Sequence, residues 1–91
     1  MEIRQTPLFK RNYKKLHKQQ KIVVNGEIKK IAADPTIGVE KKQDLAGIYV
    51  YKFKIDLQLF LLAYTFDPST LTLQMLGVHE NVYRDFKKYH L

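Results

Sequence analysis

The stretch that decides the fold reads Leu71-Thr72-Leu73-Gln74-Met75-Leu76-Gly77-Val78-His79-Glu80-Asn81-Val82-Tyr83-Arg84-Asp85-Phe86. Its apolar first half predicts a strand that stops at Gly77, because glycine allows a tight bend or a close approach of another backbone. Asn81, directly before Val82, is a suitable N-cap for a helix. The stretch therefore predicts a strand, a short junction carrying His79, and a helix.

The junction brings together two side chains that are suited to chemistry. His79 and Tyr83 are four residues apart, so both project from one face if the helix has begun by His79. An imidazole and a phenol beside the positive end of a helix suit an anionic ligand that undergoes proton transfer. The junction is therefore a candidate functional site.

Two further strands are predicted before this stretch. Ile48 to Ile55 alternates, with aromatic side chains on one face and with Lys52 and Lys54 on the other. Leu59 to Phe66 is a near-continuous apolar run, which is typical of a central strand buried on both faces. Short turns, one near Asp56 and one at Asp67-Pro68-Ser69-Thr70, would join these two strands and a third from Leu71 to Val78 into an antiparallel meander.

The N-terminal half predicts a short strand and a helical hairpin. Glu2 to Gln5 precedes Thr6-Pro7, an N-cap followed by proline at the first helical position. A second helical pattern stops at Asp34-Pro35, because the residue before proline is pushed out of helical geometry. Thr36 to Gly47 is interpreted as an irregular loop. The expected fold is α+β in a single domain, residues 1–91, in which a strand and a helical hairpin pack on a small antiparallel sheet with a short C-terminal helix.

Composition limits the classes of function. The net charge of +7 and the pI near 9.7 favour a polyanionic partner, either nucleic acid or an acidic protein, although a merely soluble basic protein is the alternative. The absence of cysteine excludes a thiol nucleophile, and the three histidines are not at metal-ligand spacing. No segment approaches the roughly 20 apolar residues of a membrane span, and Met1 to Gln5 lacks the apolar run of a signal peptide. A cytoplasmic protein with no metal or cofactor is expected.

Four segments in this order resemble the RelE/ParE superfamily of toxins from type II toxin–antitoxin systems: Ala33-Asp34-Pro35, Asp44 to Lys54, Leu62-Ala63-Tyr64 and Gly77 to Asp85. The resemblance covers essentially the whole chain and is strongest from Asp44 onward. It implies a compact ribonuclease fold, which in most characterised branches cleaves mRNA in the ribosomal A site. It also implies a cognate antitoxin that wraps around the toxin and holds it inactive.

The resemblance implies a set of site residues. Metal-independent RNA cleavage needs a base, an acid and positive groups around the phosphorane. His79 is the candidate acid or base, because its reference pKa of about 6.5 lies nearest working pH. Lys52 and Lys54 match the family's basic strand residues and would bind phosphate, and Tyr83 would stack on a base or offer its hydroxyl. Glu80 would act as a base or orient His79. For each of these residues a packing, capping or solvated surface role is the alternative.

One departure from the family keeps other functions open. The resembling nucleases commonly carry an arginine on the middle strand of the meander, and Leu57 to Tyr64 contains none. ParE-like members of the same fold poison DNA gyrase without cleaving RNA, so the fold does not settle the activity. The sequence therefore predicts an mRNA endoribonuclease toxin. Its alternatives are a non-catalytic inhibitor of gyrase and a catalytically incomplete RNA-binding module.

Overall fold

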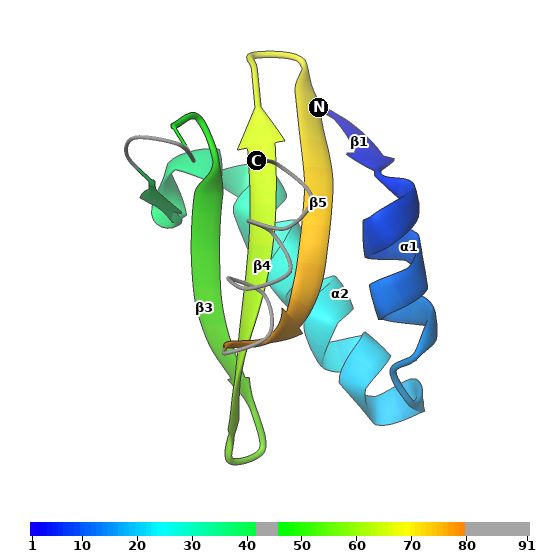
Figure 1. The fold of residues 1–91 in the computed structure, drawn as a ribbon. Coiled ribbons are helices and arrows are strands. Elements are labelled where there is room, and N and C mark those ends of the chain that lie inside the picture. The colour runs from blue at the N-terminus through cyan, green and yellow to red at the C-terminus, as the bar shows by residue number, and fades with distance from the viewer. Residues whose placement is uncertain (42–45, 80–91) are drawn as a thin grey trace.

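A computed structural model describes residues 1–41 and 46–79 (Figure 1). The strand, the helical hairpin and the meander predicted from the sequence are confirmed, whereas the predicted C-terminal helix lies outside the described residues. The elements in chain order are β1 (Glu2–Gln5), α1 (Pro7–Lys14), α2 (Lys18–Ala33), the 3-10 helix η1 (Pro35–Ile37), β2 (Val39–Glu40), β3 (Tyr49–Ile55), β4 (Gln58–Phe66) and β5 (Thr70–Val78).

The strands form one five-stranded mixed sheet in the order β1-β5-β4-β3-β2. β3, β4 and β5 are antiparallel, as predicted, whereas β1 pairs in parallel with β5, with Ile3 opposite Leu71. A parallel neighbour requires a long crossover, and α1 and α2 supply it. The prediction of an irregular loop from Thr36 to Gly47 is wrong in part, because η1 and β2 lie within it. β2 is only two residues long, too short for a periodic pattern, and it forms through its pairing with β3.

The helix boundaries follow the predicted capping residues. Thr6 caps α1 by accepting a hydrogen bond from the Phe9 N–H, with Pro7 in the first turn. α2 ends at Ala33, one residue before Asp34-Pro35. Both signals were correct because they act through neighbouring residues only.

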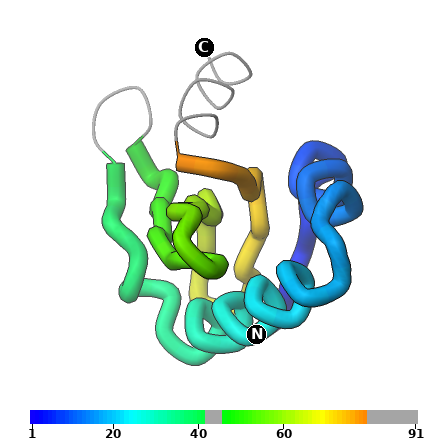
Figure 2. The backbone as a smooth tube through the Cα atoms, turned by 90° about the horizontal axis from the view of Figure 1, so that it is seen from below, coloured from blue at the N-terminus to red at the C-terminus, as the bar shows by residue number. Residues whose placement is uncertain are grey.

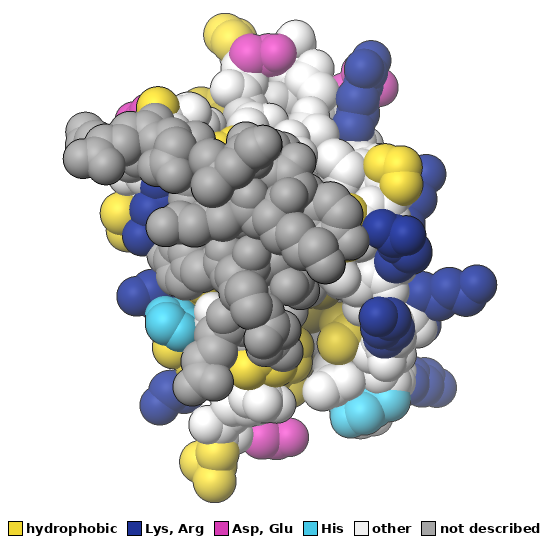
Figure 3. Space-filling view, in the orientation of Figure 1, with side chains coloured by type: hydrophobic (Ala, Val, Ile, Leu, Met, Phe, Trp, Pro, Cys, Tyr) yellow, Lys and Arg dark blue, Asp and Glu magenta, His cyan; other side chains and the backbone are white. Residues whose placement is uncertain are grey.

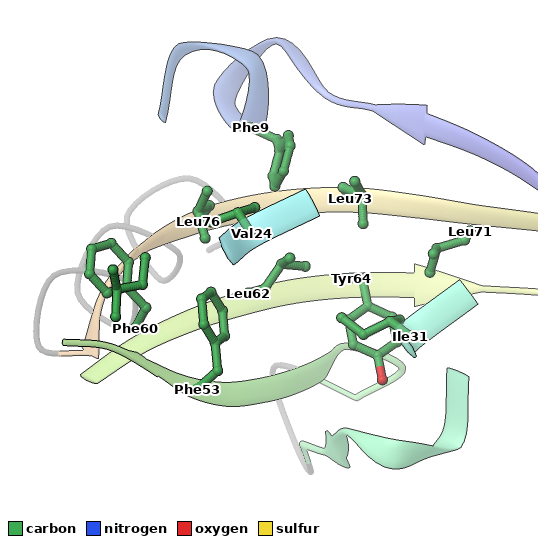
Figure 4. Close-up of a cluster of buried hydrophobic side chains, with 11 residues drawn as sticks. Phe9, Val24, Ile31, Phe53, Phe60, Leu62, Tyr64, Leu71, Leu73 and Leu76 are labelled. Atoms are coloured by element: carbon green, nitrogen blue, oxygen red, sulfur yellow. The ribbon is translucent and has the colours of Figure 1, made fainter. Parts of the chain in front are cut away.

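The main core lies between α2 and one face of the sheet. Figure 2 shows α2 crossing this face, while α1 lies beside β5 at the β1 edge. Aromatic residues Phe53, Phe60 and Tyr64 meet aliphatic residues here (Figure 4). The buried members of this cluster are Phe9, Val24, Ile31, Phe53, Ile55, Phe60, Leu62, Tyr64, Leu71, Leu73 and Leu76.

The opposite face of the sheet carries a second buried cluster. It consists of Val50, Leu61, Ala63 and Met75. Because β4 contributes to both clusters, the prediction of a central strand buried on both faces is confirmed.

A bulge interrupts β5. Ala63 pairs with Met75, but the next residue of β4, Tyr64, pairs with Leu73, which leaves Gln74 as an extra residue. The Thr6 hydroxyl donates to the Gln74 carbonyl over 2.7 Å. The bulge therefore coincides with the point where the start of α1 is attached to the sheet.

The bulge also changes which residues of β5 face α2. Leu73 belongs to the main core, and strict alternation would bring Met75 to the same side. Instead Leu76 packs in the main core and Met75 in the cluster on the opposite face. The predicted strand from Leu71 to Val78 is confirmed, but the stop expected at Gly77 is not, because Gly77 pairs with Leu61 inside β5.

Candidate active site

Lys52 and Lys54 lie on β3 and are exposed on the face of the sheet opposite α2. Their neighbours Phe53 and Ile55 are buried on the α2 side, so the predicted division of this strand into an aromatic and a lysine face is confirmed. Within the described residues neither lysine forms an ion pair with a carboxylate. Two exposed cations two residues apart have the charge that an anionic ligand requires.

His79 directly follows β5 and is half-buried. The residue before it, Val78, pairs with Phe60, the β4 residue that pairs with Phe53 on its other side. Since neighbouring strands lie about 4.8 Å apart, the backbones of Val78 and Phe53 are about 10 Å apart, and each directly precedes a predicted site residue, His79 and Lys54.

The last part of β5 reaches the lysine face through Met75 and Gly77. Met75 lies on the face opposite α2, and Gly77 pairs with Leu61, whose other neighbour is Lys52. His79 comes two residues after Gly77 and is already helical, so the alternation of β5 ends at Val78. In Figure 3 Lys and Arg side chains gather at the left of this face, over the region where Figure 1 shows β3.

Two of the predicted site residues are not placed. Tyr83 and Glu80 lie outside the described residues. The structure thus brings together Lys52, Lys54 and His79 from the predicted set.

The middle strand contributes only apolar groups between these cations. On the lysine face β4 presents Leu59, half-buried, and then Leu61 and Ala63, both fully buried. The whole of β4 contains no arginine. The site is therefore a row of cations along β3 and a histidine at the end of β5, separated by an apolar strip.

The tyrosines of β3 have a different role. The Tyr51 hydroxyl donates a 2.7 Å hydrogen bond to Glu27 of α2, and this bond, with burial, raises the pKa of Tyr51 to about 12. Glu27 also pairs with Lys30. A phenol held neutral on the α2 side joins helix to sheet and is turned away from the lysine face.

Sequence reasoning missed a cavity of about 350 Å³ beside the end of β5. Asn12 lies in its wall and accepts a hydrogen bond from the Leu76 N–H. No local pattern could reveal this cavity, because it forms only where α1 and the start of α2 meet the ends of β4 and β5. Its walls include Leu8, Asn12, Lys15, Gln20, Phe60 and Val78.

Two further properties concern metals and membranes. In the part of the chain that the structure describes, no three His, Asp or Glu side chains form a group that could hold a metal ion. None of the helices placed there has the length and apolar character that a membrane crossing requires.

The architecture defines a class of protein. A chain of the intact E. coli RelBE toxin–antitoxin complex superimposes with a TM-score of 0.68 at 14% identity, over 85% of this chain and 94% of that one. No curated protein matches the sequence. The fold is therefore that of the RelE-like α+β proteins.

The family follows from the sequence match. The family described as "ParE-like toxin of type II bacterial toxin-antitoxin system" matches residues 3–87. The chain belongs to this family of toxins, and so to the RelE/ParE superfamily.

Proposed function

We propose that this toxin is a metal-independent endoribonuclease that cleaves mRNA in the ribosome. The observation that carries the proposal is the placement of Lys52 and Lys54, which are exposed and without carboxylate partners in the described chain. They lie two strands away from the end of β5, which His79 directly follows. A histidine for proton transfer and two cations for phosphate are the groups that this reaction needs.

The residues have distinct roles in the proposed reaction. The ribose 2′-oxygen attacks the adjacent phosphorus, the bond to the 5′-oxygen breaks, and the products are a 2′,3′-cyclic phosphate and a free 5′-hydroxyl. His79 takes the proton from the 2′-hydroxyl or gives one to the leaving 5′-oxygen. Lys52 and Lys54 stabilise the negative charge of the phosphorane, and Tyr83 contacts the neighbouring base.

A cognate antitoxin and a cytoplasmic location complete the proposal. The antitoxin partner is supported by membership of a toxin–antitoxin family and by the likeness to a chain of a toxin–antitoxin complex. A segment with acidic side chains would complement the net charge of +7.

The test is induction of the chain in a bacterium that lacks the antitoxin, followed by mapping of new 5′-hydroxyl ends on mRNA. The wild type should arrest growth and make cuts in frame with translation. His79→Ala should lower the cleavage rate by roughly 10² or more, because general acid–base groups contribute that much. His17→Ala is the matched control, since His17 is exposed at the start of α2 and should leave cleavage unchanged. Equal cleavage by wild type and His79→Ala would exclude the proposed role of His79.

A second candidate is inhibition of DNA gyrase without catalysis. It is favoured by the apolar β4, which offers Leu59, Leu61 and Ala63 where the resembling nucleases commonly carry an arginine. Growth arrest without new RNA ends, together with loss of supercoiling by gyrase, would support this candidate over the nuclease.

A further inference from the structure

A second concentration of positive charge lies at the other edge of the sheet. Residues 7–21, which form α1 and the start of α2, contain six of the sixteen Lys and Arg residues and none of the nine Asp and Glu residues. We name this set the basic corner. Its members are Lys10, Arg11, Lys14, Lys15, Lys18 and Lys21.

The cations of the basic corner have no carboxylate partner within residues 1–41 and 46–79. Five of them are exposed, and the sixth, Lys21, is half-buried with its amine 5.5 Å from the centre of the Tyr13 ring. In Figure 3 Lys and Arg side chains accordingly line the right side of the molecule, where Figure 1 shows α1.

Part of this positive charge lowers the stability of the helices that carry it. Lys14 lies in the last turn of α1, where a cation is favoured by the helix dipole. Lys18 and Lys21, however, lie at the start of α2, which has no acidic residue in its first turn. Positive charge at a helix N-terminus is disfavoured, so helix stability does not explain the corner.

The side chains of the basic corner indicate which kind of partner it binds. A protein interface needs apolar or aromatic anchors at its centre. The apolar residues of α1, including Leu8, Phe9 and Tyr13, are turned toward the core, and the only large exposed hydrophobic side chain of the corner's described residues and their neighbours is Ile22. A surface of cations without apolar anchors fits a phosphate backbone better than a protein.

We infer that the basic corner binds the phosphate backbone of RNA, independently of sequence, as a contact surface separate from the lysine face of β3. Two strands, β5 and β4, lie between β1 and β3 in the sheet, so the two surfaces contact different parts of an RNA. The inference rests on the proposed function for the choice of RNA as the polyanion. It assigns binding to the corner and cleavage to the other face.

The experiment measures binding of the full chain to a labelled 2′-O-methyl RNA hairpin, which cannot be cleaved because it lacks the attacking hydroxyl. Affinities are measured over a range of salt concentrations for the wild type and for Lys10→Gln/Lys14→Gln/Lys18→Gln. The matched control is Arg4→Gln/Lys29→Gln/Lys30→Gln, which removes the same three charges elsewhere on the surface. Circular dichroism verifies that all three proteins are folded.

Loss of three phosphate contacts should reduce the slope of log K against log salt by about 2 to 3 and weaken binding at low salt by more than tenfold. The control should keep the wild-type slope. Equal losses in both variants would overturn the inference, because net charge alone would then explain binding. Unchanged RNA binding together with weaker binding of poly-glutamate by the corner variant would also overturn it, in favour of an acidic protein partner.

The outcome is independent of the proposed nuclease activity. If the corner variant loses affinity but the wild type makes no cuts, the inference stands and the proposed function fails. If the wild type cuts RNA and His79→Ala does not, while the corner variant binds RNA normally, the proposed function stands and the inference about the basic corner fails.

Discussion

Tyr64 joins the sheet to the segment that follows α2. Its side chain is completely buried, and its hydroxyl donates to the Pro35 carbonyl over 2.6 Å and accepts from the Gly38 N–H over 3.0 Å. Burial raises the pKa of Tyr64, so the hydroxyl stays protonated at neutral pH. One phenol thereby satisfies two backbone groups of η1 and its C-cap.

The close packing at Gly38 predicts that adding one methyl group there destabilises the protein. A Cβ at Gly38 would overlap the Tyr64 hydroxyl, so Gly38→Ala should lower the free energy of unfolding by about 1–3 kcal/mol. Gly26 is the control, because a Cβ there meets no atom within 4 Å and the residue lies inside α2. Gly26→Ala should raise stability by about 0.5–1 kcal/mol. Urea unfolding measures both; equal effects of the two substitutions would contradict the packing described for Gly38.

At the scale of elements, α1 is attached to β5 by the polar side chains of Thr6 and Asn12. Thr6 caps α1 and donates to the bulge carbonyl of Gln74, while Asn12 accepts from the Leu76 N–H. These contacts join segments more than sixty residues apart in the sequence.

Thr6→Val tests this attachment, since valine keeps the shape but removes the hydroxyl. We expect a loss of about 1–3 kcal/mol, because the Phe9 N–H loses its cap and the Gln74 carbonyl its donor. Thr72→Val is the matched control on β5 and should change stability by less than about 0.5 kcal/mol. Thermal unfolding of the three proteins gives the comparison, and a Thr6→Val protein as stable as the control would refute the dual role of Thr6.

Helices and strands were predictable where the sequence pattern that defines them lies in neighbouring residues. The cap at Thr6, the stop before Pro35 and the alternation of β3 depend on neighbouring residues, and all three are confirmed. The parallel pairing of β1 with β5 and the two-residue β2 were not predicted, because both are decided by partners distant in the sequence. The C-terminal helix stays a prediction.

At the scale of the whole molecule, acid stability should depend on two turn carboxylates. Asp34 accepts hydrogen bonds from the Thr36 side chain and N–H, and Asp67 accepts them from the backbone and side chain of Ser69. These bonds lower the pKa of both carboxyls below the ordinary value. A lowered pKa stabilises the folded protein above the unfolded pKa of about 3.9, and this contribution is lost as pH falls through the folded pKa.

The stability difference between wild type and Asp67→Ala should therefore be constant above pH of about 5 and should shrink as pH falls below about 4. Urea unfolding of both proteins at a series of pH values measures it. Asp56→Ala does not serve as a control, because Asp56 has a positive φ of 54°, and alanine at this position would be strained. Glu2→Ala is suitable, as its carboxylate is exposed and pairs with Arg4 only at the surface. A difference for Asp67→Ala that is independent of pH would contradict the lowered pKa.

The candidate site was predictable in part. The alternation of β3 correctly put Lys52 and Lys54 on one face away from the aromatic residues. Their nearness to His79 depends on the pairing of β4 with both neighbours, which no local pattern contains. The cavity beside α1 escaped prediction for the same reason.

The bulge at Gln74 inserts one residue into β5 and so changes which face of the sheet each later residue of the strand occupies. Each residue of β5 after Gln74 lies on the face of the sheet opposite to the one that strict alternation would give it. Without the bulge, strict alternation from Leu73 would place Met75 on the α2 side and Leu76 on the opposite face. Deleting Gln74 would remove the extra residue, and Met75 and Leu76 would keep their present faces. The faces taken by the last residues of β5, which lead directly into His79, therefore depend on one extra residue in the strand.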